Sequence, residues 1–341
     1  MRKAAFTALL LLWVSAPWAQ TPFYQGKTVV MVVGTKPGDV YDTYARLLAE
    51  HMTRYIPGSP NIIVQNMPGA ASLIAANHLY NVAKPDGLTI GAIYPALYLD
   101  QLLKKGEVKF DWVKWNWIGS TVKSNHLLYM RADTPYQSID DVRKASTPPR
   151  CGATGTTSTA YYMPKLFEET LGAKFNIVTG YQAGQEVDLA VERGEVQCRT
   201  FTIIAYFARE PFVSWRARGY VRVLVQTGAK RDERLRDVPT IYELMDRYKA
   251  TDDARRLAKV MLAAGDFGRP IVAPPGVPAD RLKILREAFD KAVKDPQFLA
   301  DAKKRNLEMD PSSGEELALL AKEVMAAPLE VVARMKVLLG G

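Results

Sequence analysis

The sequence predicts an α/β protein with two lobes, each built on a parallel-rich sheet that is flanked by helices. Apolar, β-branched runs alternate with amphipathic helical patterns along most of the 341 residues, as expected for parallel strands buried on both faces. Two loops rich in small and hydroxyl residues, 34–42 and 152–159, each follow such a run and precede a helical pattern. Backbone N–H groups at such helix starts can hold an anion, so two loops of this kind suggest a clamp.

The first lobe is predicted over 20–124 and 228–341, and the second over 125–227. The segment from residue 229 onward is mostly helical, with a turn rich in Pro and Gly before a helix at 279–294. The strands expected in the first lobe are 28–33, 62–64, 88–93 and 270–273. Those expected in the second lobe are 127–130, 150–153, 176–179, 196–203 and 221–227.

Residues 1–19 have the features of a secretory signal peptide, with a basic start at Arg2 and Lys3, an apolar segment and a small-residue end. An N-terminal membrane anchor is the alternative, but the apolar run is shorter than the ~18 to 20 residues that span a bilayer. We therefore expect cleavage after Ala19 and a soluble, exported protein.

The composition is globular, with 48% hydrophobic, 24% charged and 10% aromatic residues. The formal charge of +9 comes from scattered Lys and Arg without a basic arm, so we expect no nucleic-acid partner. The histidines His51, His78 and His126 stand in unrelated contexts, so neither a metal site nor a cofactor is expected. Cys151 and Cys198 fall in strands of the same lobe and could form a disulfide or stay as two buried thiols.

In the first loop, Gly38 lets the backbone approach a ligand closely. Asp39 can cap the helix that begins near Val40, or it can face the cleft. Asp42 completes an acidic first turn.

In the second loop, the hydroxyls of Thr156, Thr157, Ser158 and Thr159 next to Gly155 suit oxyanion binding, although a plain Ser/Thr helix cap is the alternative. The pattern is neither a P-loop nor a nucleophile elbow, and no histidine is placed to serve Ser158.

A third loop, 180–184, offers Tyr181 and Gln182 for hydrogen bonds or stacking, and the alternative is an ordinary tight turn. Asp188, one turn into the next helix, can brace this loop. Several tyrosines near strand ends can pack on an apolar ligand body or belong to the core, namely Tyr41, Tyr94, Tyr161 and Tyr162.

The chain resembles the Bug receptors, the periplasmic substrate-binding proteins of tripartite tricarboxylate transporters. The resemblance begins with VVGTKPGDVYD at 32–42 and ARLL at 45–48 and covers nearly the whole mature chain. The matching segments that continue it, in order, are 66–70, 85–87, 152–159, 181–188, 237–240 and 273–278.

The resemblance implies a Venus-flytrap fold of the type II periplasmic-binding class, in which loops matching 34–42 and 152–159 hold a carboxylate largely through backbone N–H groups and water. The usual second glycine of the first loop is Asp39 here, with Lys36 nearby, which could favour a different or partly cationic ligand. The ligand-binding residues expected are Thr35, Lys36, Gly38, Asp39, Tyr41, Asp42, Tyr94, Gly155, Thr156, Thr157, Ser158, Thr159, Tyr181 and Gln182.

The expected function is capture of a small organic acid between the lobes by a monomeric, non-enzymatic periplasmic receptor, which delivers it to membrane permease subunits of a tripartite tricarboxylate transporter. One alternative is a receptor that passes the signal to a membrane signalling partner. Another is an exported hydrolase that uses the Ser/Thr loop, although it lacks an evident general base.

Overall fold

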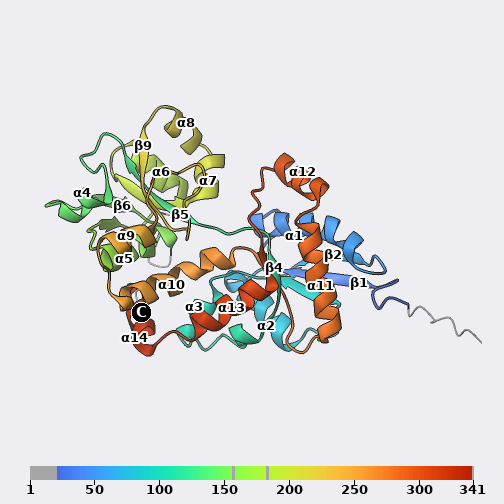
Figure 1. Cartoon of the computed structure of the whole chain (residues 1–341). Coiled ribbons are helices and arrows are strands. Elements are labelled where there is room, and N and C mark those ends of the chain that lie inside the picture. Colours follow the sequence, from blue (N-terminus) through green and yellow to red (C-terminus); the bar gives the residue numbers. More distant parts are fainter. Residues whose placement is uncertain (1–20, 156–157, 182–183, 340–341) are drawn as a thin grey trace, which may run out of the picture.

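The computed structural model describes residues 21–155, 158–181 and 184–339, which form two lobes around two sheets (Figure 1). The signal peptide predicted at 1–19 lies outside the described residues, as do Thr156, Thr157 and Gln182. The two-lobed α/β fold predicted from the sequence is confirmed.

All strands that the sequence predicts are present, and β4 and the two-residue β11 add to them. The strands are β1 (Thr28–Val33), β2 (Asn61–Asn66), β3 (Thr89–Ala92), β4 (Asn116–Ser120), β5 (His126–Arg131), β6 (Arg150–Gly152), β7 (Asn176–Val178), β8 (Cys198–Thr202), β9 (Val221–Gln226), β10 (Pro270–Ala273) and β11 (Ser312–Ser313). The α-helices are α1 (Val40–Met52), α2 (Leu73–Asn81), α3 (Leu97–Leu102), α4 (Ile139–Lys144), α5 (Thr159–Leu171), α6 (Gly184–Glu192), α7 (Ile203–Ala208), α8 (Phe212–Ala217), α9 (Ile241–Arg247), α10 (Asp252–Phe267), α11 (Ala279–Ala292), α12 (Pro296–Lys304), α13 (Gly314–Met325) and α14 (Leu329–Leu338).

The first sheet has the strand order β11-β4-β10-β3-β1-β2. Strand β1 pairs in parallel with β2 and β3, because helical crossovers join these strands. Strand β10 returns antiparallel between β3 and β4, so the sheet is mixed. The apolar, β-branched sequence of β1 fits its place, since Val29, Met31 and Val33 are fully buried between helices.

The second sheet has the order β7-β6-β8-β5-β9, with parallel pairing around β6 and antiparallel pairing around β5. Cys151 of β6 and Cys198 of β8 are direct partners in this sheet, with their Cα atoms 4.5 Å apart. The structure joins them in a disulfide, which ties two neighbouring strands under the second loop.

The chain crosses between the sheets twice, and the two crossings pack on each other. The segment between β4 and β5 leads out, and α10 leads back to β10. The Ser124 N–H donates to the Gly265 carbonyl across 2.8 Å. Gly268 has a φ of +62°, and a Cβ there would lie 1.8 Å from the Val122 carbonyl oxygen, so only glycine fits this approach.

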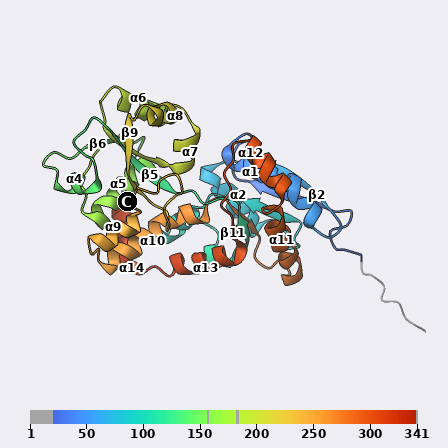
Figure 2. The same cartoon turned by 45° about the horizontal axis from the view of Figure 1, so that its top comes forward.

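Helix α10 lies against elements of both lobes (Figures 1 and 2). It contacts α13 and α14 and also α5 of the second lobe, which in turn contacts α9. At the end of α10, Phe267 stacks on Trp117 with ring centroids 5.2 Å apart, inside a buried aromatic cluster with Trp112 and Tyr98. This cluster fixes the point where α10 meets the first sheet.

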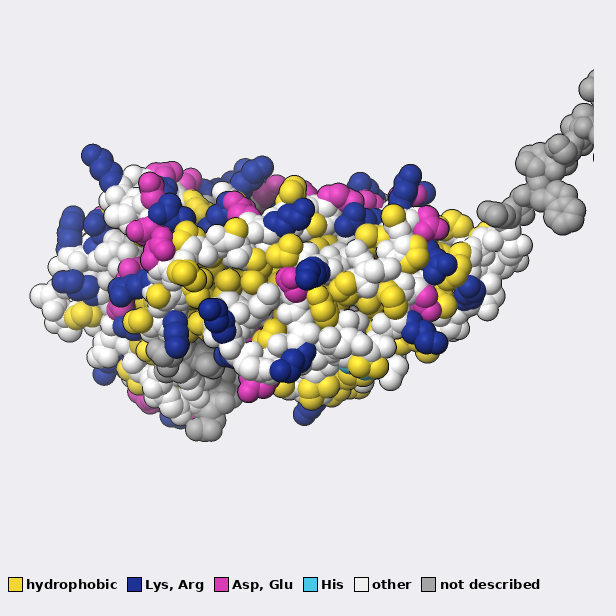
Figure 3. Space-filling model, turned by 90° about the horizontal axis from the view of Figure 1, so that it is seen from below, with side chains coloured by type: hydrophobic (Ala, Val, Ile, Leu, Met, Phe, Trp, Pro, Cys, Tyr) yellow, Lys and Arg dark blue, Asp and Glu magenta, His cyan; other side chains and the backbone are white. Residues whose placement is uncertain are grey.

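Over the described part of the chain, no helix is long and apolar enough to cross a membrane. On the face shown in Figure 3, Lys and Arg side chains are scattered among acidic and apolar ones and form no continuous basic band. This distribution agrees with the scattered basic residues of the sequence.

Replacing both Cys151 and Cys198 by Ala is expected to lower the free energy of unfolding by about 2–4 kcal/mol, because the disulfide restricts the unfolded chain over a sequence separation of 47. Urea unfolding of the oxidised wild type and the double variant measures this difference. Wild type unfolded in dithiothreitol serves as the control and should match the variant. An unchanged midpoint in both cases would contradict the role of the disulfide.

Candidate functional site

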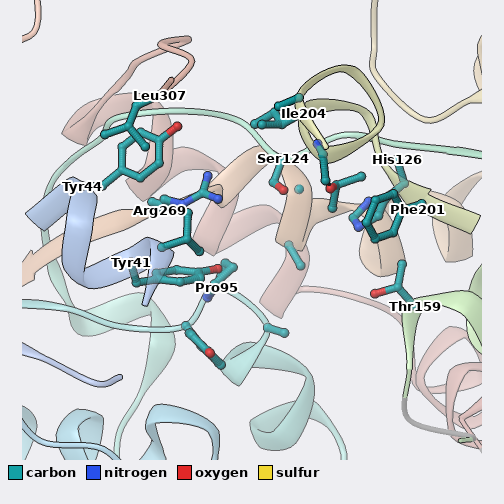
Figure 4. A pocket seen from close by; sticks show the side chains of 18 of the residues that line it. Tyr41, Tyr44, Pro95, Ser124, His126, Thr159, Phe201, Ile204, Arg269 and Leu307 are labelled. Atoms are coloured by element: carbon teal, nitrogen blue, oxygen red, sulfur yellow. The ribbon is translucent and has the colours of Figure 1, made fainter. Parts of the chain in front are cut away.

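A cavity of about 590 Å³ lies between the lobes and takes its walls from both (Figure 4). The first lobe contributes the start of α1, the segment after β3 and the residues around Arg269 before β10. The second lobe contributes the start of β5, the start of α5 and the junction of β8 with α7. Its volume is in the range of small-molecule sites.

Two of the tyrosines expected at the site line this cavity. The rings of Tyr41 and Tyr94 pack with their centroids 4.6 Å apart. Burial raises the pKa of both phenols, so both remain neutral at physiological pH. The pair therefore offers an apolar surface with hydroxyl groups at its edge.

Arg269 is the most notable lining residue that the sequence did not predict. Its guanidinium carbon lies 4.4 Å from the ring centroid of Tyr44 and 5.3 Å from that of Tyr41. Figure 4 shows it between these two rings at the cavity. Its Nε and Nη1 are buried and have no hydrogen-bond partner among the described residues. These two donors are therefore unpaired, while the residue itself lines the cavity with its positive charge.

His126 and Phe201 line the opposite side of the cavity, on the second lobe (Figure 4). Burial lowers the pKa of His126 to about 4, so its imidazole is neutral at pH 7. The charged side chains among the described lining residues are Arg209 and Arg269, both cationic. Arg209 is exposed at the end of α7. The cavity therefore favours an anion.

The first loop uses both of its acids within the protein. The Asp39 carboxylate accepts from the Tyr41 N–H across 2.9 Å and caps α1, which is the first of the two roles considered for it. Asp42 is buried and accepts from the Gly38 N–H, Asn66 and Arg46 at 2.8–2.9 Å. Burial raises the pKa of Asp42, but these hydrogen bonds outweigh it and hold the pKa below its ordinary value.

The remaining first-loop residues lie away from the cavity lining. Lys36 is exposed, and Gly38 has a φ of +80°, which suits glycine. Thr35 is buried, and its hydroxyl has no hydrogen-bond partner in the described parts of the chain.

In the second loop, Thr159 lines the cavity at the first turn of α5. The Ser158 hydroxyl donates to the Gly155 carbonyl across 2.7 Å, so it is occupied within the loop. A Cβ built on Gly155 would meet no atom within 4 Å, so the loop is open at that point. Thr156 and Thr157 lie outside the described residues.

Tyr181 packs with the second lobe's core rather than lining the cavity, and Gln182 lies outside the described residues. Asp188 accepts from Arg199 at 2.5 Å and from the Tyr129 hydroxyl at 2.9 Å. Arg199 also donates to the Gly184 carbonyl across 3.0 Å. Asp188 thus braces the start of α6 through Arg199, as the sequence suggested.

The unexpected lining residues had weak signals in the sequence. Arg269 stands between Gly268 and Pro270 at a helix-to-strand junction, where the sequence indicates only a turn, although the side chain lines the cavity. Within the described ranges, no group of His, Cys, Asp and Glu side chains could hold a metal ion.

Asp42→Asn is expected to lower the free energy of unfolding by about 2–3 kcal/mol, because the amide replaces a buried carboxylate that accepts three hydrogen bonds. The matched control is Asp39→Asn, which neutralises an acid of the same loop but keeps a good capping residue. Urea unfolding should show a change below about 0.5 kcal/mol for the control. Equal effects of the two substitutions would contradict this assignment.

His126→Gln is expected to flatten the loss of stability as the pH falls from 6.5 to 4. In the wild type, the unfolded imidazole takes a proton near pH 6.5, whereas the folded imidazole takes one only near pH 4. Above pH 6.5 the imidazole is neutral in both states, so it does not change the free energy of unfolding with pH. Between pH 6.5 and pH 4 the unfolded state binds one more proton, so the free energy of unfolding falls by up to about 1.4 kcal/mol for each unit by which the pH is lowered. Urea unfolding from pH 7 to pH 4.5 measures both slopes, and parallel curves would exclude this effect.

Comparisons with known proteins place the chain in a family. The model described as "Tripartite tricarboxylate transporter family receptor" matches residues 44–335. The UPF0065 protein in gbd 5'region of Cupriavidus necator is 25% identical over 337 residues, covering 97% of this chain and 94% of that protein.

Two solved structures have the same fold. A TctC solute binding protein from Polaromonas, solved without ligand, has a TM-score of 0.72 at 19% identity and covers 91% of this chain and 99% of that one. MatC from Rhodopseudomonas palustris, solved with bound malate, has a TM-score of 0.58 at 19% identity and covers 90% of this chain and 99% of that one. The resemblance to Bug receptors is thereby confirmed. The chain belongs to the tripartite tricarboxylate transporter receptor family, whose members are periplasmic solute-binding proteins and not enzymes.

Proposed function

We propose that this protein captures a small organic acid in the cavity between its lobes and delivers it to the membrane permease subunits of a tripartite tricarboxylate transporter. The observation that carries the proposal is the charge of the cavity. Its walls come from both lobes, and its charged side chains, among the described lining residues, are Arg209 and Arg269. The malate bound in the structure of MatC is an organic acid of the kind expected.

The moving parts proposed are 20–124 with 228–341 as one lobe and 125–227 as the other. The protein would act as a monomer and reach the periplasm through the signal peptide at 1–19. Closure of the lobes around the acid would follow a hinge motion at the two crossings. The ligand-binding residues predicted from the sequence take part through Tyr41, Tyr94 and Thr159, which line the cavity.

The hydrolase alternative finds no support in the described site. The Ser158 hydroxyl donates to a backbone carbonyl, and the phenols of the cavity have raised pKa values through burial. The imidazole of His126 lines the cavity from the start of strand β5. Within the described chain, it forms no hydrogen bond with Ser158. Capture without chemistry is therefore the function that this site supports best.

A thermal-shift screen of small carboxylic acids tests the proposal on the mature protein. At least one acid should raise the melting temperature by several degrees, with a shift that grows with concentration, because a ligand that binds only the folded state stabilises it. The amide of each acid serves as its matched control and should give a much smaller shift. If no acid stabilises the protein more than its amide, the proposal fails.

A further inference from the structure

The described lining of the cavity includes a cation without an ion-pair partner, Arg269. Arg269 forms no ion pair within the described residues, and its buried Nε and Nη1 have no acceptor there. Burying donors and charge without partners costs free energy. The ring faces of Tyr41 and Tyr44 compensate for part of this cost by cation–π contact.

The position of Arg269 is fixed from both sides. Its own N–H donates to the Ser120 hydroxyl across 2.9 Å. Phe267, two residues before it, is buried in the aromatic cluster, and Gly268 approaches the Val122 carbonyl closely. Tyr44, on which the guanidinium rests, donates to the Glu308 carbonyl across 2.8 Å. A charge held in place in this way needs little reorganisation when a ligand binds.

The chemistry of a guanidinium in the cavity wall indicates a carboxylate. A guanidinium presents its N–H groups in a planar fork that matches the two oxygens of a carboxylate. No acidic side chain lines the cavity in the described chain, so a ligand carboxylate would have no competitor there.

The rest of the cavity is suited to a flat, apolar body. On the first lobe, Tyr41 and Tyr94 form an aromatic pair. On the second lobe, Phe201 and the neutral His126 face them across the cavity (Figure 4). Arg209 is the other cation among the described lining residues, and it is exposed at the rim. A second carboxylate would therefore meet no buried positive charge.

We propose that Arg269 anchors the ligand carboxylate and determines specificity, and that the ligand is an aromatic monocarboxylate whose ring lies between the aromatic residues of the two lobes. This inference rests on the proposed capture of an organic acid and adds the anchoring residue and the ligand class. It also makes a side chain beside the hinge, and not only the backbone of the two loops, responsible for recognising the acid.

Isothermal titration calorimetry of the mature protein with benzoate tests the assignment. Benzoate should bind the wild type more tightly than succinate or benzamide does. In Arg269→Gln, the dissociation constant for benzoate should rise on the order of 100-fold, because the charge-assisted hydrogen bonds are lost. A rise of about tenfold is the smallest that supports the proposal. Arg269→Lys, which keeps the charge but lacks the planar fork, should give an intermediate value.

The matched control is Arg256→Gln, which removes an exposed arginine of helix α10 that pairs with Asp253 and is not among the residues that line the cavity. It should bind benzoate as the wild type does. Without ligand, Arg269→Gln should melt at or above the wild-type temperature, because the lost guanidinium has buried donors without hydrogen-bond partners, and the cation–π contacts offset only part of that cost. This readout separates loss of an anchor from loss of folding.

Two results would overturn the inference and leave the proposed function intact. One is benzoate binding of equal affinity in the wild type and in folded Arg269→Gln. The other is tighter binding of succinate than of benzoate by the wild type. Binding of none of these acids, together with a negative screen of other acids, would instead overturn the proposed function itself.

Discussion

The close packing of the two chain crossings is the constraint on which the rest of the structure depends. Backbone meets backbone there, since the Ser124 N–H bonds the Gly265 carbonyl and the Gly268 Cα lies against the Val122 carbonyl. These contacts set where α10 ends and where β10 begins. The lobes are joined at this point, and the same few residues direct Arg269 into the cavity between them. The packing of the two crossings therefore determines both how the lobes are joined and where Arg269 lies in the cavity.

The acids of the first loop form hydrogen bonds within the protein, whereas the cation Arg269 lines the cavity. Asp39 caps α1, and Asp42 holds the first loop together through three hydrogen bonds. Both carboxylates satisfy N–H groups that would otherwise be orphans at a helix start. Asp39 stands where the resemblance to the Bug receptors implies a glycine, and its carboxylate accepts a hydrogen bond from its own helix. The Asp39 carboxylate, which would repel an anion if it faced the cleft, is thus hydrogen-bonded at the start of α1.

The fold was predictable because its signals are local. The apolar run of β1, the glycine-rich turn and the amphipathic α1 lie within 25 residues of one another in the sequence. The same reason explains why the sequence pointed to Tyr41, Tyr94 and Thr159, which line the cavity, since each lies at or near the end of a strand or the start of a helix. The place of Arg269 in the lining could not be predicted, because it arises from a tertiary approach between segments that are 149 residues apart and are joined at Ser120. His126 and Phe201 were missed because they face the cavity only once β5 and β8 are paired.

The same unpaired charge bears on how the lobes respond to a ligand. Closing an empty cavity would withdraw Arg269 further from water without giving it a partner, and that desolvation opposes closure. A bound carboxylate removes this penalty, because its negative charge gives the guanidinium a partner. A ligand shifts a conformational equilibrium only by the difference in its affinity for the two states, and here the difference is greatest for an anion that reaches Arg269. A neutral molecule of the same shape would fill the cavity but leave the charge uncompensated. Selectivity for an acid and coupling to closure then have the same physical origin.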